Sequence, residues 1–387
     1  MRTYEKTHKW ITFKADLREI PYNIWMLLGE AQSKCAHIAG IPLMPAVAED
    51  MHQVYLAKGA LATTAIEGNT LTEEEVLKRL EGKLELPPSK EYLGKEIDNI
   101  IESCNLIKNH VLNEELKHIS IEKIKNFNRL VLKGLPNEKE VSPGEIRKCM
   151  VDVARYRAVE PQDCEFLLKK LCQWLNEEFV PPQGQTIAFG ILKSILSHLY
   201  IAWIHPFMDG NGRTARLLEF QILLTSGVPS ASAHLLSNHY NETRQEYYRQ
   251  LDNASKSGGN IVPFIEYALQ GFVDGLKSQI NLIRKQQLEV HWINFIHFIF
   301  KDKHTTSDHR RRDLILDLSK HDAGIPVSKV KHITPQIAEK YANKTQKTLI
   351  RDINILGKMD LIKKTKEGIL PRKEIILAFL PPTLHVD

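Results

Sequence analysis

The chain has 387 residues, of which 43% are hydrophobic and 26% are charged, a composition typical of ordinary globular proteins rather than disordered chains. No signal peptide is expected, because no clean apolar stretch follows the first residues. The cysteines are scattered without a CxxC pair, which excludes a disulfide scaffold or zinc ribbon and favours the reducing cytoplasm. They are Cys35, Cys104, Cys149, Cys164 and Cys172.

The formal net charge of +5 is unevenly distributed along the chain. Residues 301–387 hold 18 Lys and Arg against 11 Asp and Glu, so the rest of the chain is slightly acidic. A basic segment is typical of nucleic-acid contact. A solvated lysine-rich surface explains the charge equally well.

The first 300 residues are predicted to be mostly helical, because apolar residues recur at three- to four-residue spacing. The most apolar window, residues 187–204, is interrupted by Lys193, Ser194 and His198 and is therefore predicted to be a buried core helix, with no membrane span. The other predicted helices cover residues 51–62, 100–112, 121–132, 166–179 and 261–292.

One segment breaks the helical pattern. In residues 147–159, Val151 and Val153 alternate with polar residues, which predicts a small β-hairpin. Pro143 and Pro161 bound this segment.

Residues 205–216, HPFMDGNGRTAR, connect the apolar core helix to a second apolar helix. Gly210 and Gly212 let the backbone approach a phosphate closely, and the free N–H groups at a helix start favour an anion there. Arg213 and Arg216 lie three residues apart at that helix start, so they would repel each other unless an anion lies between them.

Two further side chains of the same loop have the chemistry that phosphate transfer needs. Asp209 is its only carboxylate and suits Mg²⁺ bridging phosphates. His205, at the loop entrance, suits a base that takes a proton from a hydroxyl. Each residue alone is more often part of a turn or core, but their combination favours a function.

The loop resembles the signature HPFxDGNGRxxR of the Fic domain, whose typical members transfer AMP from ATP to a protein hydroxyl. The resemblance covers about residues 40–275 and implies an all-α fold: a Fic-type helical core with a small β-hairpin flap. It implies that Phe207 anchors the loop. It also implies that His205 is the catalytic base, that Asp209 binds Mg²⁺, and that Gly210, Asn211, Gly212, Arg213 and Arg216 bind the phosphates of ATP.

Upstream, Thr63, Glu67 and Gly68 fit the inhibitory motif (Ser/Thr)xxxE(Gly/Asn) of many Fic proteins. Local chemistry alone favours an ordinary helix end with a solvated Glu67. The resemblance implies instead that Glu67 pairs with Arg216, which removes the partner of the γ-phosphate. The same glutamate could orient a water and support removal of AMP, an alternative that the sequence leaves open.

The resemblance also places the substrates. It implies that a target protein docks on the edge of the flap hairpin, residues 147–159, by backbone hydrogen bonds. Residues 238–248 resemble the family helix that lines the adenosine pocket, which makes Tyr240 and Tyr248 candidates for contact with the base or ribose. Packing or surface aromatics are the alternative.

Residues 301–312 form a polar stretch that we interpret as the link to a tail domain. Predicted helices at 314–318, 335–341 and 345–356, with Thr334 as an N-cap, and strands at 361–362 and 375–380 follow the order of a winged helix-turn-helix. The predicted domains are therefore an N-terminal helical region with the inhibitory helix at 1–110, a Fic catalytic core at 111–300, and a winged helix at 305–387.

The sequence thus favours a self-inhibited, cytoplasmic protein adenylyltransferase that uses ATP and Mg²⁺. The winged helix would contact DNA or dock a protein. The alternatives are a DNA-binding regulator whose Fic domain senses nucleotide, and a Fic enzyme that uses another phosphate-containing donor or removes AMP. A homodimer stays open.

Overall fold

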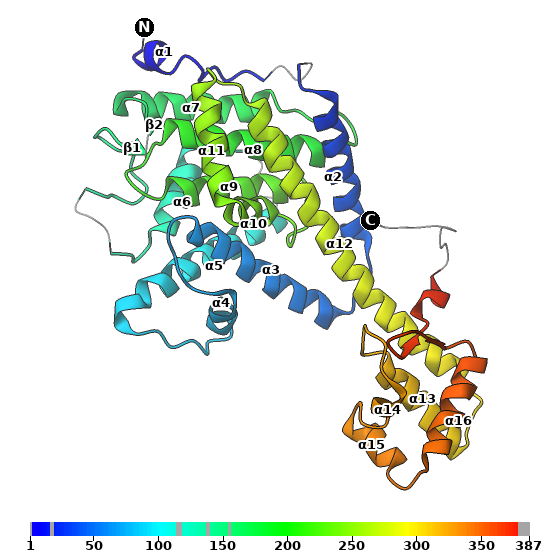
Figure 1. Ribbon diagram of the computed structural model, residues 1–387. Helices are drawn as coiled ribbons and strands as arrows, with labels where there is room; N and C mark the ends of the chain where they lie inside the picture. Colours follow the sequence, from blue (N-terminus) through cyan, green and yellow to red (C-terminus); the bar gives the residue numbers. More distant parts are fainter. Residues whose placement is uncertain (1, 16–18, 114–117, 137–139, 154–155, 378–387) are drawn as a thin grey trace. The chain divides into compact units, whose positions relative to one another are not determined.

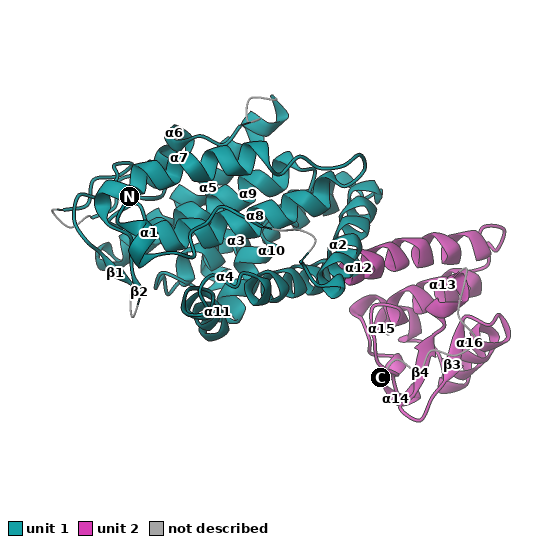
Figure 2. Ribbon diagram, turned by 90° about the horizontal axis from the view of Figure 1, so that it is seen from above, with its two compact units in different colours: residues 1–280 teal, residues 281–387 magenta. Residues whose placement is uncertain are grey.

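The computed structural model describes residues 2–15, 19–113, 118–136, 140–153 and 156–377. The chain divides into two compact units, Met1–Ile280 and Asn281–Asp387, and the boundary falls inside one long helix, α12 (Val262–Ile299) (Figures 1 and 2). The described part is mainly helical, with two short two-stranded sheets, as the sequence predicted.

Unit 1 contains the helices that precede the boundary and one hairpin. They are α1 (Tyr4–Thr7), α2 (Tyr22–Gly40), α3 (Pro45–Ala65), α4 (Glu73–Leu80), a 3-10 turn at Pro88–Lys90, α5 (Glu91–Leu112), α6 (Ile121–Val131), β1 (Asp152–Val153), β2 (Tyr156–Arg157), α7 (Pro161–Glu177), α8 (Thr186–Ile204), α9 (Asn211–Thr225), α10 (Leu235–Glu242), α11 (Arg244–Lys256) and the first half of α12.

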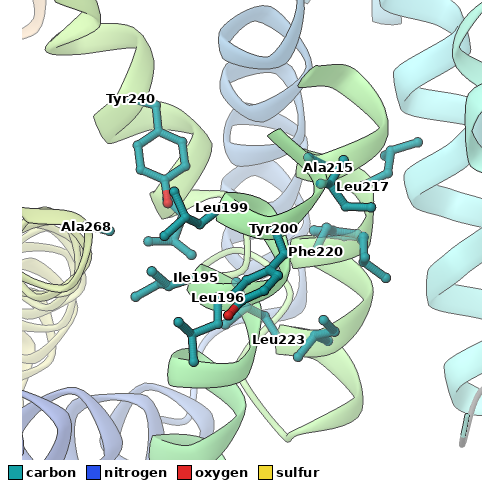
Figure 3. Close-up of a cluster of buried hydrophobic side chains, with 14 of the residues drawn as sticks. Ile195, Leu196, Leu199, Tyr200, Ala215, Leu217, Phe220, Leu223, Tyr240 and Ala268 are labelled. Carbon is teal, nitrogen blue, oxygen red and sulfur yellow. The ribbon is translucent and has the colours of Figure 1, made fainter. Parts of the chain in front are cut away.

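Helices α8 and α9 form the centre of unit 1 (Figure 1). Side chains such as Ile195 and Leu199 of α8 and Leu223 of α9 are fully buried between them (Figure 3). Helix α8 is the one described helix long and apolar enough to cross a membrane, but most of it is buried inside the unit. The prediction of a buried core helix is confirmed.

The predicted regions 1–110 and 111–300 are not separate bodies in the structure. Helices α3 and α5, from the first region, pack directly on α9 from the second. The physical reason is that α9 is buried on every side, so it needs neighbours from both halves of unit 1.

The turn between α3 and α4 fixes the backbone around Glu67. Gly68 has φ +108, a left-handed conformation that ends α3. Helix α4 then starts with a capping box in which Thr72 accepts from the Glu75 N–H and Glu75 accepts from the Thr72 N–H. Both ends of this turn are therefore set by local hydrogen bonds.

The predicted hairpin forms, and its paired strands are shorter than residues 147–159. Asp152 pairs with Arg157 and Val153 with Tyr156, while residues 154–155 lie outside the described part. The Tyr156 hydroxyl donates to the Trp203 carbonyl at 2.6 Å. This bond fixes the hairpin, which we call the flap, against the end of α8.

Unit 2 contains the end of α12 and four further helices. They are α13 (Thr306–Leu318), α14 (Val327–Val330), α15 (Pro335–Tyr341) and α16 (Gln346–Lys358), followed by β3 (Ile362–Lys364), β4 (Ile369–Pro371) and a 3-10 turn at Lys373–Ile376. Ile325 bridges to Ile369 of β4. This order matches the predicted helix-turn-helix with a hairpin, and its assignment as a winged helix stays a prediction.

Two details of the predicted tail are wrong. The second strand is Ile369–Pro371 rather than 375–380, because Gly368, at φ +142, makes the tight turn that pairs β4 with β3. Residues 378–380 lie outside the described part. The stretch 301–312 is not a linker, because Thr305 caps α13 and the end of α12 shares the core of unit 2.

A buried carboxylate joins three helices of unit 2. Asp352, fully buried on α16, accepts from Nε of Arg310 at 2.8 Å, from Nε of Arg311 at 2.9 Å and from the Tyr341 hydroxyl at 2.9 Å. These bonds explain why a run of arginines is helical here. Their side chains are neutralised inside the unit rather than solvated.

Replacing Asp352 with Asn should strongly destabilise unit 2. The change leaves the largely buried Arg310 without its anion and Arg311 with Asp308 alone, and breaking a buried ion pair typically costs about 3–5 kcal/mol. Chemical unfolding followed by circular dichroism measures the effect. Asp322→Asn, which removes an exposed partner of Lys285, is the matched control and should change stability little. Equal stability of the two variants would contradict this account of Asp352.

Candidate active site

The loop between α8 and α9 has a strained start and an open end. His205 lies in the left-handed region at φ 48 and ψ 60, and Gly210 at φ 77. Helix α9 begins at Asn211 without a side-chain cap, so its first N–H groups are available to a ligand. The local backbone is therefore built for an anion at the start of α9.

Phe207 and Asn211 hold the loop in this shape. Phe207 is buried, as expected for an anchor. The Asn211 side chain accepts from the Phe207 N–H at 2.9 Å and donates to the Phe207 carbonyl at 2.8 Å. Asn211 thus uses its amide to brace the loop, and its contribution to phosphate binding would come from its backbone.

A cavity of about 620 Å³ opens beside this loop. It lies between the turn after α3, the flap, the α8–α9 loop and α11. Its lining residues are Ile66, Glu67, Val153, Tyr156, His198, Ala202, Trp203, His205, Asn211, Gly212, Ala215, Tyr247, Tyr248, Arg249, Leu251, Asp252 and Ser255. His205 and the inhibitory candidate Glu67 therefore share one cavity.

The surroundings of His205 keep its imidazole uncharged. Burial, and secondly the nearby Arg147 guanidinium, lower the pKa of the imidazole to about 4, against the opposing effect of Glu67 and Asp209. A hydrogen bond to the Ala202 carbonyl also favours the protonated form but does not outweigh burial. At neutral pH the ring is thus uncharged and can accept a proton.

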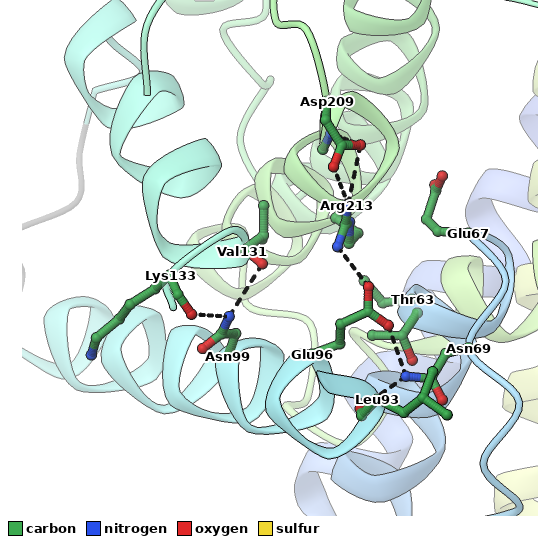
Figure 4. A network of polar contacts seen from close by, with 12 residues as sticks. Thr63, Glu67, Asn69, Leu93, Glu96, Asn99, Val131, Lys133, Asp209 and Arg213 are labelled. Carbon is green, nitrogen blue, oxygen red and sulfur yellow. Dashed lines mark hydrogen bonds and ion pairs between the residues drawn. The ribbon is translucent and has the colours of Figure 1, made fainter. Parts of the chain in front are cut away.

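Arg213 and Arg216 of the motif bind different partners and do not face one common anion site. Arg213 pairs with Glu96 of α5 and with Asp209, each at 3.0 Å, as Figure 4 shows. Arg216 donates to Glu67 at 2.5 Å and to the Thr63 carbonyl at 2.9 Å. Each guanidinium therefore has carboxylate partners of its own, and the expected Glu67–Arg216 contact is present.

Arg216 also has N–H groups that are available to bind a ligand. Within the described residues, its Nε and Nη1 atoms are buried and have no hydrogen-bond partner. Buried polar atoms of this kind are rarely left unpaired. Two unpaired N–H donors beside the open start of α9 are what a phosphate would satisfy.

Glu67 is held as an anion. Burial alone would raise its pKa, but the Arg216 charge and hydrogen bond, with smaller contributions from Arg213 and His205, hold the pKa of Glu67 below its ordinary value. Its side chain is still 32% exposed, whereas Arg216 is 1% exposed. The carboxylate thus lies at the cavity wall with the arginine behind it.

Asp209 fits a magnesium ligand that completes its coordination with substrate oxygens. Its side chain is 50% exposed, and no group of three or more His, Cys, Asp or Glu that could hold a metal occurs among the described residues. Mg²⁺ commonly takes one or two carboxylates with phosphates and water. A single accessible carboxylate next to a phosphate-binding helix start suits that mode.

The two tyrosine candidates for the adenosine pocket, Tyr240 and Tyr248, lie in different surroundings. Tyr248 lines the cavity and its hydroxyl donates to the Ile66 carbonyl at 3.2 Å. Tyr240 does not line the cavity, and the prediction that it contacts adenosine is wrong. It is fully buried and donates to Glu219 at 3.0 Å, because the chain breaks between α10 and α11 at Thr243 and turns Tyr240 into the core.

Sequence reasoning missed Tyr247, Leu251 and Ser255, which form one helical face of α11 along the cavity. Their spacing of four residues was a usable signal. His198 of α8 also lines the cavity, and its ring nitrogen lies 2.8 Å from the Tyr247 hydroxyl.

Comparison with known proteins shows similarity to one family around this site. A model of the Fic/DOC family matches residues 118–223. Over 229 residues the chain is 32% identical to protein adenylyltransferase fic-1 of Caenorhabditis elegans, covering 57% of this chain and 42% of that protein. Over 205 residues it is 31% identical to protein adenylyltransferase Fic of Nematostella vectensis, covering 53% and 44%. The chain thus spans less than half the length of these curated relatives.

Solved structures agree with this match. A fragment of Fic-1 from C. elegans superposes with a TM-score of 0.55 at 26% identity, over 68% of this chain and 74% of that one. A Fic family protein from Desulfovibrio desulfuricans superposes with a TM-score of 0.55 at 20% identity, over 89% and 91%, which shows a shared fold. The loop at 205–216 thus lies within the residues that the Fic/DOC family model matches, and the helical fold around it is similar to that of solved Fic structures.

Proposed function

We propose that this chain is a protein adenylyltransferase, which transfers AMP from ATP to a Ser, Thr or Tyr hydroxyl of a target protein. The observation that carries the proposal is an uncharged His205 in the same cavity as the open start of α9. The names of the relatives from C. elegans and N. vectensis support it.

In this reaction each residue has a defined task. His205 takes the proton of the target hydroxyl, whose oxygen bonds to the α-phosphorus of ATP while the bond to pyrophosphate breaks. The N–H groups of Gly212 and its neighbours, with Arg213, bind the phosphates. Asp209 would hold Mg²⁺, which neutralises phosphate charge when bound. The target would lie along the flap, adding to its edge by backbone hydrogen bonds.

We further propose that Glu67 inhibits the enzyme. The carboxylate occupies one edge of the Arg216 guanidinium and would repel the γ-phosphate of ATP. Removal of AMP by a water that Glu67 orients would use the same carboxylate, and a change of donor would leave these contacts intact. The added mass in the experiment below distinguishes the donors, and loss of AMP from a modified target incubated with the parent but not with Glu67→Gly would show removal.

The variant Glu67→Gly should transfer AMP faster than the parent. Loss of one charge-assisted hydrogen bond, worth ~1.5–3 kcal/mol, corresponds to a roughly 10- to 150-fold increase. Mass spectrometry of lysate proteins incubated with ATP and the variant reports both the added mass and the modified residue. Adding His205→Asn, which tolerates the left-handed backbone but provides no base, should abolish transfer.

Glu81→Gly serves as the matched control, because Glu81 is an exposed glutamate just after α4, outside the cavity. It should transfer AMP at the parent rate. Equal rates for the parent and Glu67→Gly would refute the inhibitory role. An added mass other than AMP would point to another donor.

The pH dependence of the Glu67→Gly variant tests His205. The base must be neutral, and its pKa is lowered to about 4, so protonation and loss of activity are expected only near that pH. Loss of Glu67 removes an anion that raises this pKa, which extends the active range further. Initial rates measured from pH 5 to 8, with folding checked at each pH, should be nearly flat. A half-maximal rate near pH 6.5, the value of a free imidazole, would contradict this environment.

We also propose that unit 2 contacts DNA. A groove of about 700 Å³ runs along α16 and β3, and basic residues line it at Lys347, Arg351, Lys358 and Lys364. Cations arranged along a helix and an adjoining strand suit the phosphates of a duplex. The alternative, docking of a protein, would use the exposed Ile350 in the same groove.

The double variant Lys347→Glu/Arg351→Glu of the full chain should bind duplex DNA more weakly and with less salt dependence. Each lost phosphate contact lowers the slope of log K against log salt by about 0.9, so two contacts lower it by about 2. Mobility shifts at several salt concentrations give the slope. Lys301→Glu/Lys329→Glu is the control for net charge, because it makes the same charge change at two exposed lysines outside the groove lining and should keep the parent slope. No binding by the parent at low salt would rule DNA out.

A further inference from the structure

His205 has a backbone conformation that its own sequence does not favour. Its left-handed φ of 48 is one of three positive values among described non-glycine residues, with Phe13 and Asp360. Its N–H still donates to the Ile201 carbonyl at 2.8 Å, and Pro206 follows directly. A residue before proline is pushed towards extended conformations, so contacts outside the loop must keep His205 in place.

Arg147, at the foot of the flap, supplies those contacts. Its Nε donates to the His205 carbonyl at 2.7 Å and its backbone N–H to the Pro206 carbonyl at 3.0 Å. Its Nη1 donates to the Cys149 carbonyl at 2.8 Å and its Nη2 to the Val159 carbonyl. The residue is 3% exposed. One guanidinium therefore joins the backbone of His205 to both arms of the flap.

The position of this cation also matters for the ring. Arg147 is the only cation among the charged groups that most affect the His205 imidazole, where Glu67 and Asp209 are the anions. It thus disfavours a second positive charge on the ring from the same place where it holds the backbone. Lysine could keep the charge, but its single ammonium lacks the planar fork that reaches three carbonyls.

We infer that Arg147 is a positioning residue for His205, which sets the backbone of the base and ties it to the two arms of the flap. This inference rests on the proposed function, because it assigns Arg147 a task in AMP transfer. A residue that only stabilised the fold would affect the amount of folded protein. Arg147 should instead affect the rate of the chemical step.

The test compares Arg147→Lys and Arg147→Gln in the Glu67→Gly background, with KM for ATP, kcat and thermal unfolding measured for each. Both variants should lower kcat by about 100-fold, the scale of a 1 Å displacement of a reacting group, and leave KM for ATP nearly unchanged. Arg129→Lys is the matched control, since Arg129 is an exposed arginine on α6 near the turn that precedes Arg147. It should behave as the parent.

The pH dependence of the rate distinguishes the hydrogen bonds of the Arg147 guanidinium from the effect of its positive charge. In Arg147→Lys the acid limb of the rate should stay where it is, whereas in Arg147→Gln it should move to higher pH, because the cation beside the imidazole is gone. Unchanged kcat in both variants, or a loss that follows the fraction of unfolded protein, would overturn the inference. Absence of AMP transfer by Glu67→Gly itself would instead refute the proposed function.

Discussion

Two arginines buried on one helix constrain the arrangement of unit 1. Arg213 and Arg216 of α9 are 6% and 1% exposed, and a buried guanidinium without an anion is very costly. Their carboxylates come from other elements, Glu96 from α5 and Glu67 from the end of α3. The packing of α3 and α5 against α9 therefore supplies anions for the buried arginines and also buries apolar side chains.

The two carboxylates are not equivalent. Glu96 is 15% exposed, burial raises its pKa, and its second oxygen accepts from the Asn69 amide at 2.9 Å (Figure 4). It is part of the framework. Glu67 is more exposed and its turn is anchored two residues later by Asn69. The same asparagine thus fixes Glu96, the partner of Arg213, and anchors the turn that carries Glu67, the partner of Arg216.

Local signals predicted much of this arrangement, and long-range bonds account for the rest. The cap at Thr334, the flap hairpin and the α8–α9 loop follow from patterns within a few residues, and each is present. Arg147 carried no such signal, because its side chain binds three carbonyls at unrelated spacings, those of Cys149, Val159 and His205, which leaves no periodicity. Nor did the sequence show that Tyr240 is buried, because the Glu219 carboxylate that its hydroxyl contacts lies on another helix.

Gly212 matters both for the approach of a phosphate and for the contact with Glu67, and only the first role could be predicted from the motif. A glycine there allows a phosphate to approach the backbone, as the motif predicted. A Cβ at this position would meet Oε1 of Glu67 at 2.2 Å and Nη1 of Arg216 at 3.0 Å. The Glu67 carboxylate therefore lies against the backbone that the phosphate would approach. Competition between them follows from space as well as from charge, so a substitution that only neutralises Glu67 would remove part of the obstacle, while loss of its side chain removes both parts.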